Sequence, residues 1–294
     1  MKAISNYIGK LLRTRSDKLI KENNIAIVAI AKNEADYIKE WVTFHKAVGI
    51  NNIILYDNES TDGMHDQIVD FIKEGFVIYN TICGSLQQYN AYNDALRRYE
   101  KKYKYLAFID CDEFLFPVNH NNSLISVIDK FFEYDYNIGG VVVNWAMYGS
   151  SGFEKKPEGL LIQNFLYRAD LPKGKGTNVV KTICRPELVK KFSNPHYPVY
   201  KIGIHAVSCS TGAVVPMWDN TIEEYRGLRI NHYFTKSKEE WIRRREGVGR
   251  ADLSSKRTID EFYEHDNNDV RDDSALFYLG KMKQILNEKN NNNE

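Results

Sequence analysis

The sequence predicts an α/β fold with a Rossmann-like, mostly parallel central sheet flanked by helices, in a single domain. The first observation is a rhythm: short β-branched runs alternate with amphipathic stretches between residues 25 and 109. This order is typical of βαβ units, whose consecutive strands are parallel. The second observation is that the sequence contains no internal repeat and no linker rich in Pro, Gly or Ser. These patterns together favour one domain over several.

The composition is that of a globular protein near electrical neutrality. Of the 294 residues, 43% are hydrophobic, and 40 Lys and Arg nearly balance 39 Asp and Glu. This balance excludes the basic excess typical of nucleic-acid-binding proteins. The four cysteines lie far apart without a CxxC pair, which disfavours a zinc site and a disulfide framework. We therefore expect reduced thiols in a cytoplasmic protein.

The first half contains the clearest elements. Ile25 to Ala31 is a continuous apolar run, as expected of a strand buried on both faces. The stretch 35–48 has apolar residues at helical spacing, and Gly49 can end that helix. The pattern then predicts strands over 53–56, 76–79 and 105–109, with helices over 60–73 and 87–103.

The second half and the two termini are less regular. We expect strands over 139–144, 181–184 and 206–210 and a basic helix over 236–247. The expected organisation is a basic amphipathic helix over 1–22, the main domain over 23–252, a helical extension over 253–286 and a disordered tail over 287–294. The first helix either docks on the domain or makes a peripheral contact with an anionic membrane. No apolar run in the sequence is long enough to cross a bilayer.

Polar and acidic residues follow three of the expected strands. Asn33 and Glu34 follow the first, Asp57 the second, and the acidic turn 110–113 the fourth. Because parallel strands place their carboxyl ends at one edge, these side chains should share a rim. Carboxylates at such a rim suit Mg²⁺ or Mn²⁺ bound to a diphosphate, where the cation would stabilise a phosphate leaving group.

Three segments resemble a known enzyme family. IAIVAIAKNEADYIKEWVTFHKAVGINNIILYDNESTD, FIDCDEFLFP and NHYFTKS are similar to nucleotide-sugar glycosyltransferases of the GT-A fold, above all families 2 and 92, over about residues 25–252. The resemblance implies that Asp57 holds the uracil of a UDP-sugar, with Asn33 and Glu34 beside the nucleotide. It also implies that Asp110 and Asp112 form the DxD pair on ribose, metal and diphosphate.

The resemblance assigns further residues in the second half. It places Trp145 and Gly149, in the stretch WAMYGSSG, beside the sugar and the acceptor. It makes His232 a third metal ligand next to Asp110 and Asp112. Lys236 and the run 243–245 would add positive charge near the phosphates, although a solvated basic helix face is an alternative.

The catalytic base is the part of the motif that this chain lacks. Enzymes of both families invert the anomeric carbon, which requires a base for the acceptor hydroxyl. Family 2 members commonly use an Asp beside a Glu, but the corresponding stretch here is SNPHY, residues 193–197. His196 is therefore one candidate and Asp219 another.

The expected function is metal-dependent, inverting transfer of a sugar from a UDP-sugar to a glycan or lipid-linked acceptor. Analogy with the family suggests cell-surface polysaccharide or lipopolysaccharide biosynthesis on the cytoplasmic side of a membrane. A silent sugar-nucleotide or glycan-binding module is one alternative. A phosphatase of the haloacid-dehalogenase type is the other, although Phe114 stands where that motif has Thr or Val.

Overall fold

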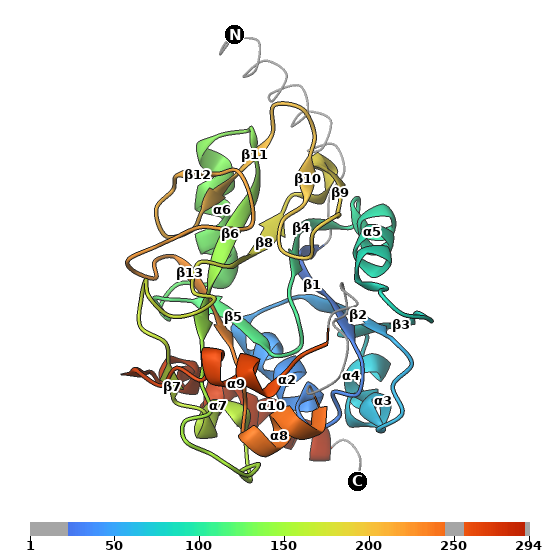
Figure 1. Ribbon diagram of the computed structural model, residues 1–294. Coiled ribbons are helices and arrows are strands. Elements are labelled where there is room, and N and C mark those ends of the chain that lie inside the picture. The colour runs from blue at the N-terminus through green and yellow to red at the C-terminus, as the bar shows by residue number, and fades with distance from the viewer. Residues whose placement is uncertain (1–22, 245–255, 292–294) are drawn as a thin grey trace.

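The structure is a computed structural model that describes residues 23–244 and 256–291 (Figure 1). The expected helix over 1–22 and the end of the one over 236–247 lie outside the described residues. Within the described part, none of the helices is both long and apolar enough to cross a membrane.

The first half folds as alternating strands and helices. Its elements are β1 (Asn23–Ala31), α2 (Ile38–Val48), β2 (Asn52–Asp57), α3 (Met64–Gln67), α4 (Val69–Lys73), β3 (Val77–Thr81), α5 (Gln88–Tyr99) and β4 (Tyr103–Phe108). The helix expected over 60–73 is two short helices that meet at Ile68. It starts late because Ser60 turns back and donates its backbone N–H to the Asp57 carboxylate at 2.9 Å.

The second half adds shorter elements. They are β5 (Glu113–Pro117), α6 (Leu124–Tyr134), β6 (Ile138–Met147), α7 (Leu161–Asn164), β7 (Tyr167–Arg168), β8 (Val180–Cys184), the 3₁₀ helix η1 (Pro186–Leu188), β9 (Val189–Lys191), β10 (Val199–Tyr200), β11 (His205–Ser208), β12 (Val214–Val215), β13 (Leu228–His232), α8 (Lys238–Arg244), α9 (Ile259–His265), β14 (Val270–Arg271), the 3₁₀ helix η2 (Ser274–Tyr278) and α10 (Leu279–Asn291).

The central sheet confirms the α/β class. Its strand order is β12-β11-β6-β8-β4-β1-β2-β3, and β1, β2, β3 and β4 pair in parallel as expected. The sheet as a whole is mixed, because β8 runs antiparallel between β4 and β6. Strand β13 pairs antiparallel with β5 and in parallel with the last residues of β6. These pairings bring His232 of β13 next to Glu113, at the start of β5.

Helices cover both faces of the sheet (Figure 1). Alternate residues of a strand point to opposite faces, so Ile27 packs into the core with α2, whereas Val28 packs with α5. Gly49 ends α2 in the left-handed conformation, with φ of 104°, and its N–H returns to the His45 carbonyl at 3.2 Å.

The C-terminal segment differs from its expected disorder. Helix α10 continues to Asn291, so the expectation of a disordered tail is wrong for residues 287–291. The helix is held because Met282 and Ile285 are buried and the Lys289 ammonium lies 2.9 Å from the Glu74 carboxylate. Residues 292–294 lie outside the described part of the chain.

Candidate functional site

The carboxyl ends of β1, β2 and β4 lie side by side and form the expected rim. The pairing of Ala31 with Asp57 aligns the ends of the first two strands. Asn33 joins the loops that follow them: its backbone N–H donates to Ser60 Oγ at 2.9 Å, and its Oδ1 accepts from Thr61 N at 2.8 Å. The two loops are therefore fixed to each other before any ligand binds.

Asp57 is buried at the end of β2 with an anchored carboxylate. Its Oδ1 accepts from the Ser60 backbone, and its Oδ2 accepts a short hydrogen bond from the Tyr79 hydroxyl. Since both oxygens have a protein partner, the carboxylate is oriented by the fold.

The acidic turn between β4 and β5 contains three carboxylates with different surroundings. Both oxygens of Asp110 accept hydrogen bonds, one from Lys181 Nζ at 2.7 Å and the other from Gln88 Nε2 at 3.1 Å. Burial opposes ionisation of Asp110, but the Lys181 ammonium outweighs it and lowers the pKa of the carboxyl. Asp110 is therefore an ionised group that is already paired with a protein cation.

Asp112, Glu113 and His232 form the group that could hold a metal ion. One ligand atom from each lies within 4.8 Å of the others, and all three residues are buried. His232 Nε2 is 3.5 Å from Asp112 Oδ1, and the register of β13 with β5 sets His232 opposite Glu113. Two carboxylates and an imidazole are suitable ligands for Mn²⁺ and can also bind Mg²⁺. The donor set thus fits the expected divalent cation.

Both carboxylate oxygens of Glu113 lie close to other residues of the site, which the sequence alone did not predict. Its Oε2 accepts the Asp110 backbone N–H at 3.1 Å, and its Oε1 lies 3.5 Å from Lys181 Nζ. Complete burial raises the pKa of Glu113 well above its usual range. Nearby positive charge, from Lys181 or a metal ion, favours the ionised form.

The Trp145 ring packs between the rings of His232 and His196. The Trp145 ring lies 4.2 Å from the His232 ring and 5.2 Å from the His196 ring, measured between centroids. The buried indole N–H of Trp145 has no hydrogen-bond acceptor among the described residues. The structure therefore brings Trp145 and His196 to the same place as the candidate metal ligands.

The chemistry of His196 follows from its surroundings. Its Nδ1 lies 3.1 Å from the Val180 carbonyl, which fixes the proton on Nδ1 and leaves Nε2 as an acceptor. Burial and the nearby Lys181 lower the pKa of His196 to about 3. The imidazole is therefore neutral at physiological pH.

Lys236 and Glu34 lie at the β1 end of the rim. Lys236 Nζ is 3.9 Å from Glu34 Oε2 and 4.7 Å from the Tyr37 ring centroid. Arg244 of α8 also contacts Glu34, at 2.8 Å, and Arg243 contacts Asp36 at 2.8 Å. These cations are paired with the acids that follow β1, and Arg245 lies outside the described residues.

Gly149 and Asp219 are not brought into this group. A Cβ on Gly149 would stand 2.5 Å from Asn268 Oδ1, so the glycine permits close packing against the segment 266–268. Asp219 is exposed and accepts a hydrogen bond from Asn178 at 2.9 Å. Within the described ranges, no hydrogen bond or ion pair joins Asp219 to the acidic turn.

Lys181 and Gln88 are site residues that sequence reasoning missed. The signal for Lys181 was present, since it is a lysine inside the buried run VVKTIC. Gln88 starts α5 and gave no comparable signal, because its role depends on where that helix begins relative to β4.

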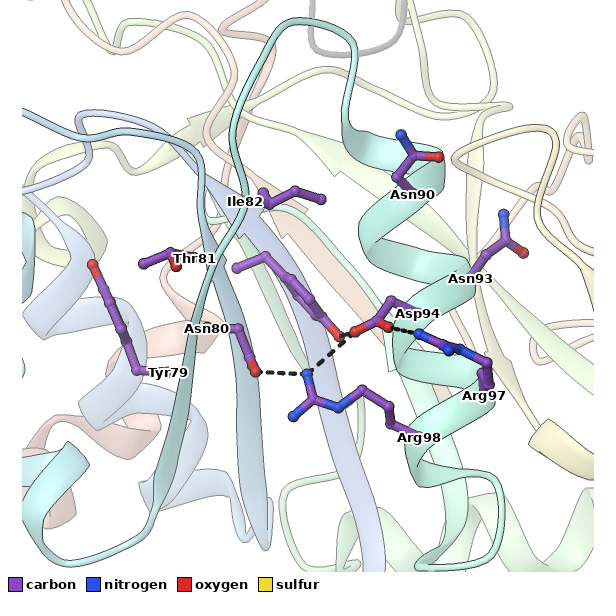
Figure 2. Close-up of a pocket in the computed structure, with 10 residues that line it drawn as sticks. Tyr79, Asn80, Thr81, Ile82, Asn90, Asn93, Asp94, Arg97 and Arg98 are labelled. Carbon is purple, nitrogen blue, oxygen red and sulfur yellow. Dashed lines mark hydrogen bonds and ion pairs between the residues drawn. The ribbon is translucent and has the colours of Figure 1, made fainter.

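A hollow of about 900 Å³ lies next to this site, between β3 and α5 (Figure 2). Its charged groups are paired with each other: Asp94 contacts Arg98 at 3.2 Å, and Arg98 also donates to Asn80 at 2.8 Å. The hollow adjoins the rim through Tyr79, whose hydroxyl donates to Asp57. Among the described residues that line it there is no group of potential metal ligands, so the acidic turn remains the candidate for the chemistry.

Comparisons with known proteins identify the family of this chain. The model of glycosyltransferase family 92 matches residues 25–260, most of the chain. A family 92 protein from Arabidopsis thaliana is 23% identical over 212 residues, which cover 69% of this chain and 36% of that protein. A family 92 protein from rice, Oryza sativa subsp. japonica, is 24% identical over 216 residues, which cover 72% of this chain and 33% of that protein. The chain thus spans about a third of the length of these curated relatives.

Solved structures resemble the chain only weakly. Staphylococcus aureus TarS 1-349 in complex with UDP has a TM-score of 0.37 and 14% identity, with 56% of this chain and 47% of that chain covered. Glucosyl-3-phosphoglycerate synthase from Mycobacterium tuberculosis has a TM-score of 0.27 and 16% identity, with 45% and 47% covered. Likeness at this level supports no conclusion about ligands.

Proposed function

The chain belongs to glycosyltransferase family 92, and from this we propose that it transfers a sugar from a nucleotide-sugar donor, a UDP-sugar, to a glycan or lipid-linked acceptor. The observation that carries the proposal is the meeting of Asp112, Glu113 and His232 at the rim where β1, β2 and β4 end. Ligands of open α/β sheets bind at this edge.

We propose that Asp112 and His232, with Glu113, would hold Mn²⁺ or Mg²⁺. The bound cation would supply positive charge to the diphosphate as the sugar bond breaks. Asp110 was expected to be a metal ligand as well. Its pairing with Lys181 and Gln88 favours a role in fixing the turn and facing the ribose.

The donor would lie along the rim. Asp57 would hold the base, and Asn33 and Glu34 would lie beside the nucleotide, as the family resemblance implies. The anchoring of the Asp57 carboxylate by Ser60 and Tyr79 supports this, because a pre-oriented acceptor needs no reorganisation on binding. The unpaired indole N–H of Trp145 would donate to the sugar or the diphosphate.

His196 is the better candidate for the base of an inverting reaction. Both His196 and His232 contact the Trp145 ring, whereas the Asp219 side chain is exposed and accepts a hydrogen bond from Asn178. The low pKa of His196 keeps Nε2 free to accept a proton at neutral pH, although it also limits the strength of the base.

The test is acceptor-dependent release of UDP from a panel of UDP-sugars, in Mn²⁺ and in EDTA. The proposal expects release that requires both the acceptor and the divalent cation. Hydrolysis of a phosphate ester without any sugar nucleotide would instead support the phosphatase alternative. Binding of a sugar nucleotide or glycan with no turnover on any acceptor would support a silent module. The biosynthetic pathway and the cytoplasmic location remain predictions.

A further inference from the structure

Lys181 is a fully buried cation near the start of β8, a strand inside the central sheet. It lies on β8, where it pairs in register with Val143 of β6, and its side chain has no exposed surface. A buried ammonium group is stable only when carboxylates or other acceptors surround it. Here it contacts Asp110 Oδ2 at 2.7 Å and Glu113 Oε1 at 3.5 Å.

This placement matters because the turn concentrates negative charge. Asp110, Asp112 and Glu113 occupy three of four consecutive positions, and Asp112 and Glu113 are both largely shielded from water. Like charges at this spacing repel each other strongly where water is excluded. An internal cation reduces this repulsion before any divalent metal binds.

We propose that Lys181 is a positioning residue that serves as the permanent cation of the acidic turn. It holds Asp110 and Glu113 in place before a divalent cation reaches the group of Asp112, Glu113 and His232. The inference rests on the metal-dependent function proposed above and adds a residue that neither the DxD motif nor the family match assigns.

The arrangement has a measurable consequence. An ammonium group beside the cation site stabilises the turn in the absence of metal and weakens metal binding by repulsion. Removal of its charge should therefore lower stability without metal and raise the affinity for Mn²⁺. A side chain that only fills space would change stability and leave Mn²⁺ affinity alone.

The experiment compares the wild type with Lys181→Met, Lys181→Arg, Asp110→Asn and the double variant Lys181→Met/Asp110→Asn. Thermal unfolding is followed in EDTA and over a range of Mn²⁺ concentrations, and bound Mn²⁺ is measured directly by electron paramagnetic resonance without nucleotide. Lys181→Arg is the matched control because it keeps the charge while changing the shape.

We expect Lys181→Met to lower Tm in EDTA by roughly 10 °C, as breaking a buried ion pair does. It should bind Mn²⁺ roughly tenfold more tightly, because the neighbouring positive charge is gone. Lys181→Arg should stay within about threefold of the wild type in Mn²⁺ affinity, since its charge is retained. In the double variant, the decrease in Tm should be at most half of that in Lys181→Met.

Unchanged Mn²⁺ affinity in Lys181→Met, or a double variant as unstable as Lys181→Met, would overturn the inference. Should Lys181→Met fail to fold, the double variant decides: folding supports the charge account, and failure overturns it. A wild type that binds no Mn²⁺ also overturns it. These outcomes are distinct from failure of the proposed function, which shows as absence of UDP release from every donor.

Discussion

The carboxylates of residues 110–113 are neighbours in the chain but have different partners. Asp110 is paired with Lys181 and Gln88, whereas Asp112 faces His232. This division makes the second acidic residue of the DxD motif a better candidate for the proposed metal ligand than the first.

If Asp112 holds the proposed metal ion, Asp112→Asn should lower kcat about 100-fold or more, because the cation that would stabilise the leaving group is lost. The substitution keeps the size of the side chain, so the protein should remain folded. The measurement is UDP release at saturating Mn²⁺, with circular dichroism as the check on folding. Full metal-dependent turnover in this variant would show that the metal site is assigned wrongly.

Asp57 provides a second prediction at the scale of one residue. Asp57→Asn should weaken UDP binding roughly tenfold, since a charge-assisted hydrogen bond contributes about 1.5 kcal/mol or more. Calorimetric titration with UDP measures the loss. Tyr79→Phe is the control that removes only the hydroxyl anchoring Asp57. We expect a smaller loss of UDP affinity from this control. Equal UDP affinity of the wild type and both variants would contradict the placement of the uracil base at Asp57.

At the scale of elements, the site depends on contacts that tie β5 to its neighbours. His45 of α2 accepts the Leu115 backbone N–H of β5 at 3.1 Å, and its other nitrogen lies 2.9 Å from the Trp41 carbonyl. Complete burial lowers the pKa of His45 to about 3. The hydrogen bond from Leu115 to His45 therefore forms only while His45 is neutral.

This pKa predicts acid sensitivity. Between about pH 6.5 and 3 the unfolded chain binds a proton at His45 that the folded chain does not, so stability falls as pH falls. The slope from this residue is about 1.4 kcal/mol per pH unit below pH 6. In urea unfolding, the free energy of unfolding should differ less between pH 7 and pH 5 for His45→Gln than for the wild type. A difference in His45→Gln equal to that of the wild type would refute the assignment.

The segment after α9 is held to the sheet by a buried charge group. Asp272 contacts Arg168 at 2.7 Å and Arg229 of β13 at 2.8 Å, and these arginines lower its pKa in spite of burial. Since β13 carries His232, this group also fixes the strand that completes the candidate metal site.

Asp272→Asn should lower the free energy of unfolding by about 3 kcal/mol, because it leaves the buried Arg229 and the largely buried Arg168 without their carboxylate. Asp273→Asn is the matched control. Its ion pair with Arg271 is about half exposed, so the expected loss is below about 1 kcal/mol. Urea unfolding of both variants gives the comparison, and similar losses would contradict the importance of the buried group.

At the scale of the whole molecule, local patterns determine one part of the site and long-range pairing determines the other. The apolar runs and the acids after them predicted the rim of Asn33, Asp57 and Asp110, because parallel strands place their ends together. The sequence pattern could not show that β13 pairs with β5 or that Lys181 reaches the turn from β8. Both depend on contacts between segments more than 70 positions apart. His232 was expected at the metal site only through the family resemblance.

Binding of UDP-sugars with and without Mn²⁺ tests the central claim most directly. The measurement is the thermal shift of the wild type and of Asp112→Asn against a panel of UDP-sugars. At a ligand concentration 100 times the Kd, the expected stabilisation is about 2.7 kcal/mol, a rise in Tm of roughly 5 °C. We predict that at least one UDP-sugar gives such a rise with Mn²⁺, and that the effect of Mn²⁺ disappears in Asp112→Asn. If no UDP-sugar raises the Tm of the wild type in the presence of Mn²⁺, the account is contradicted.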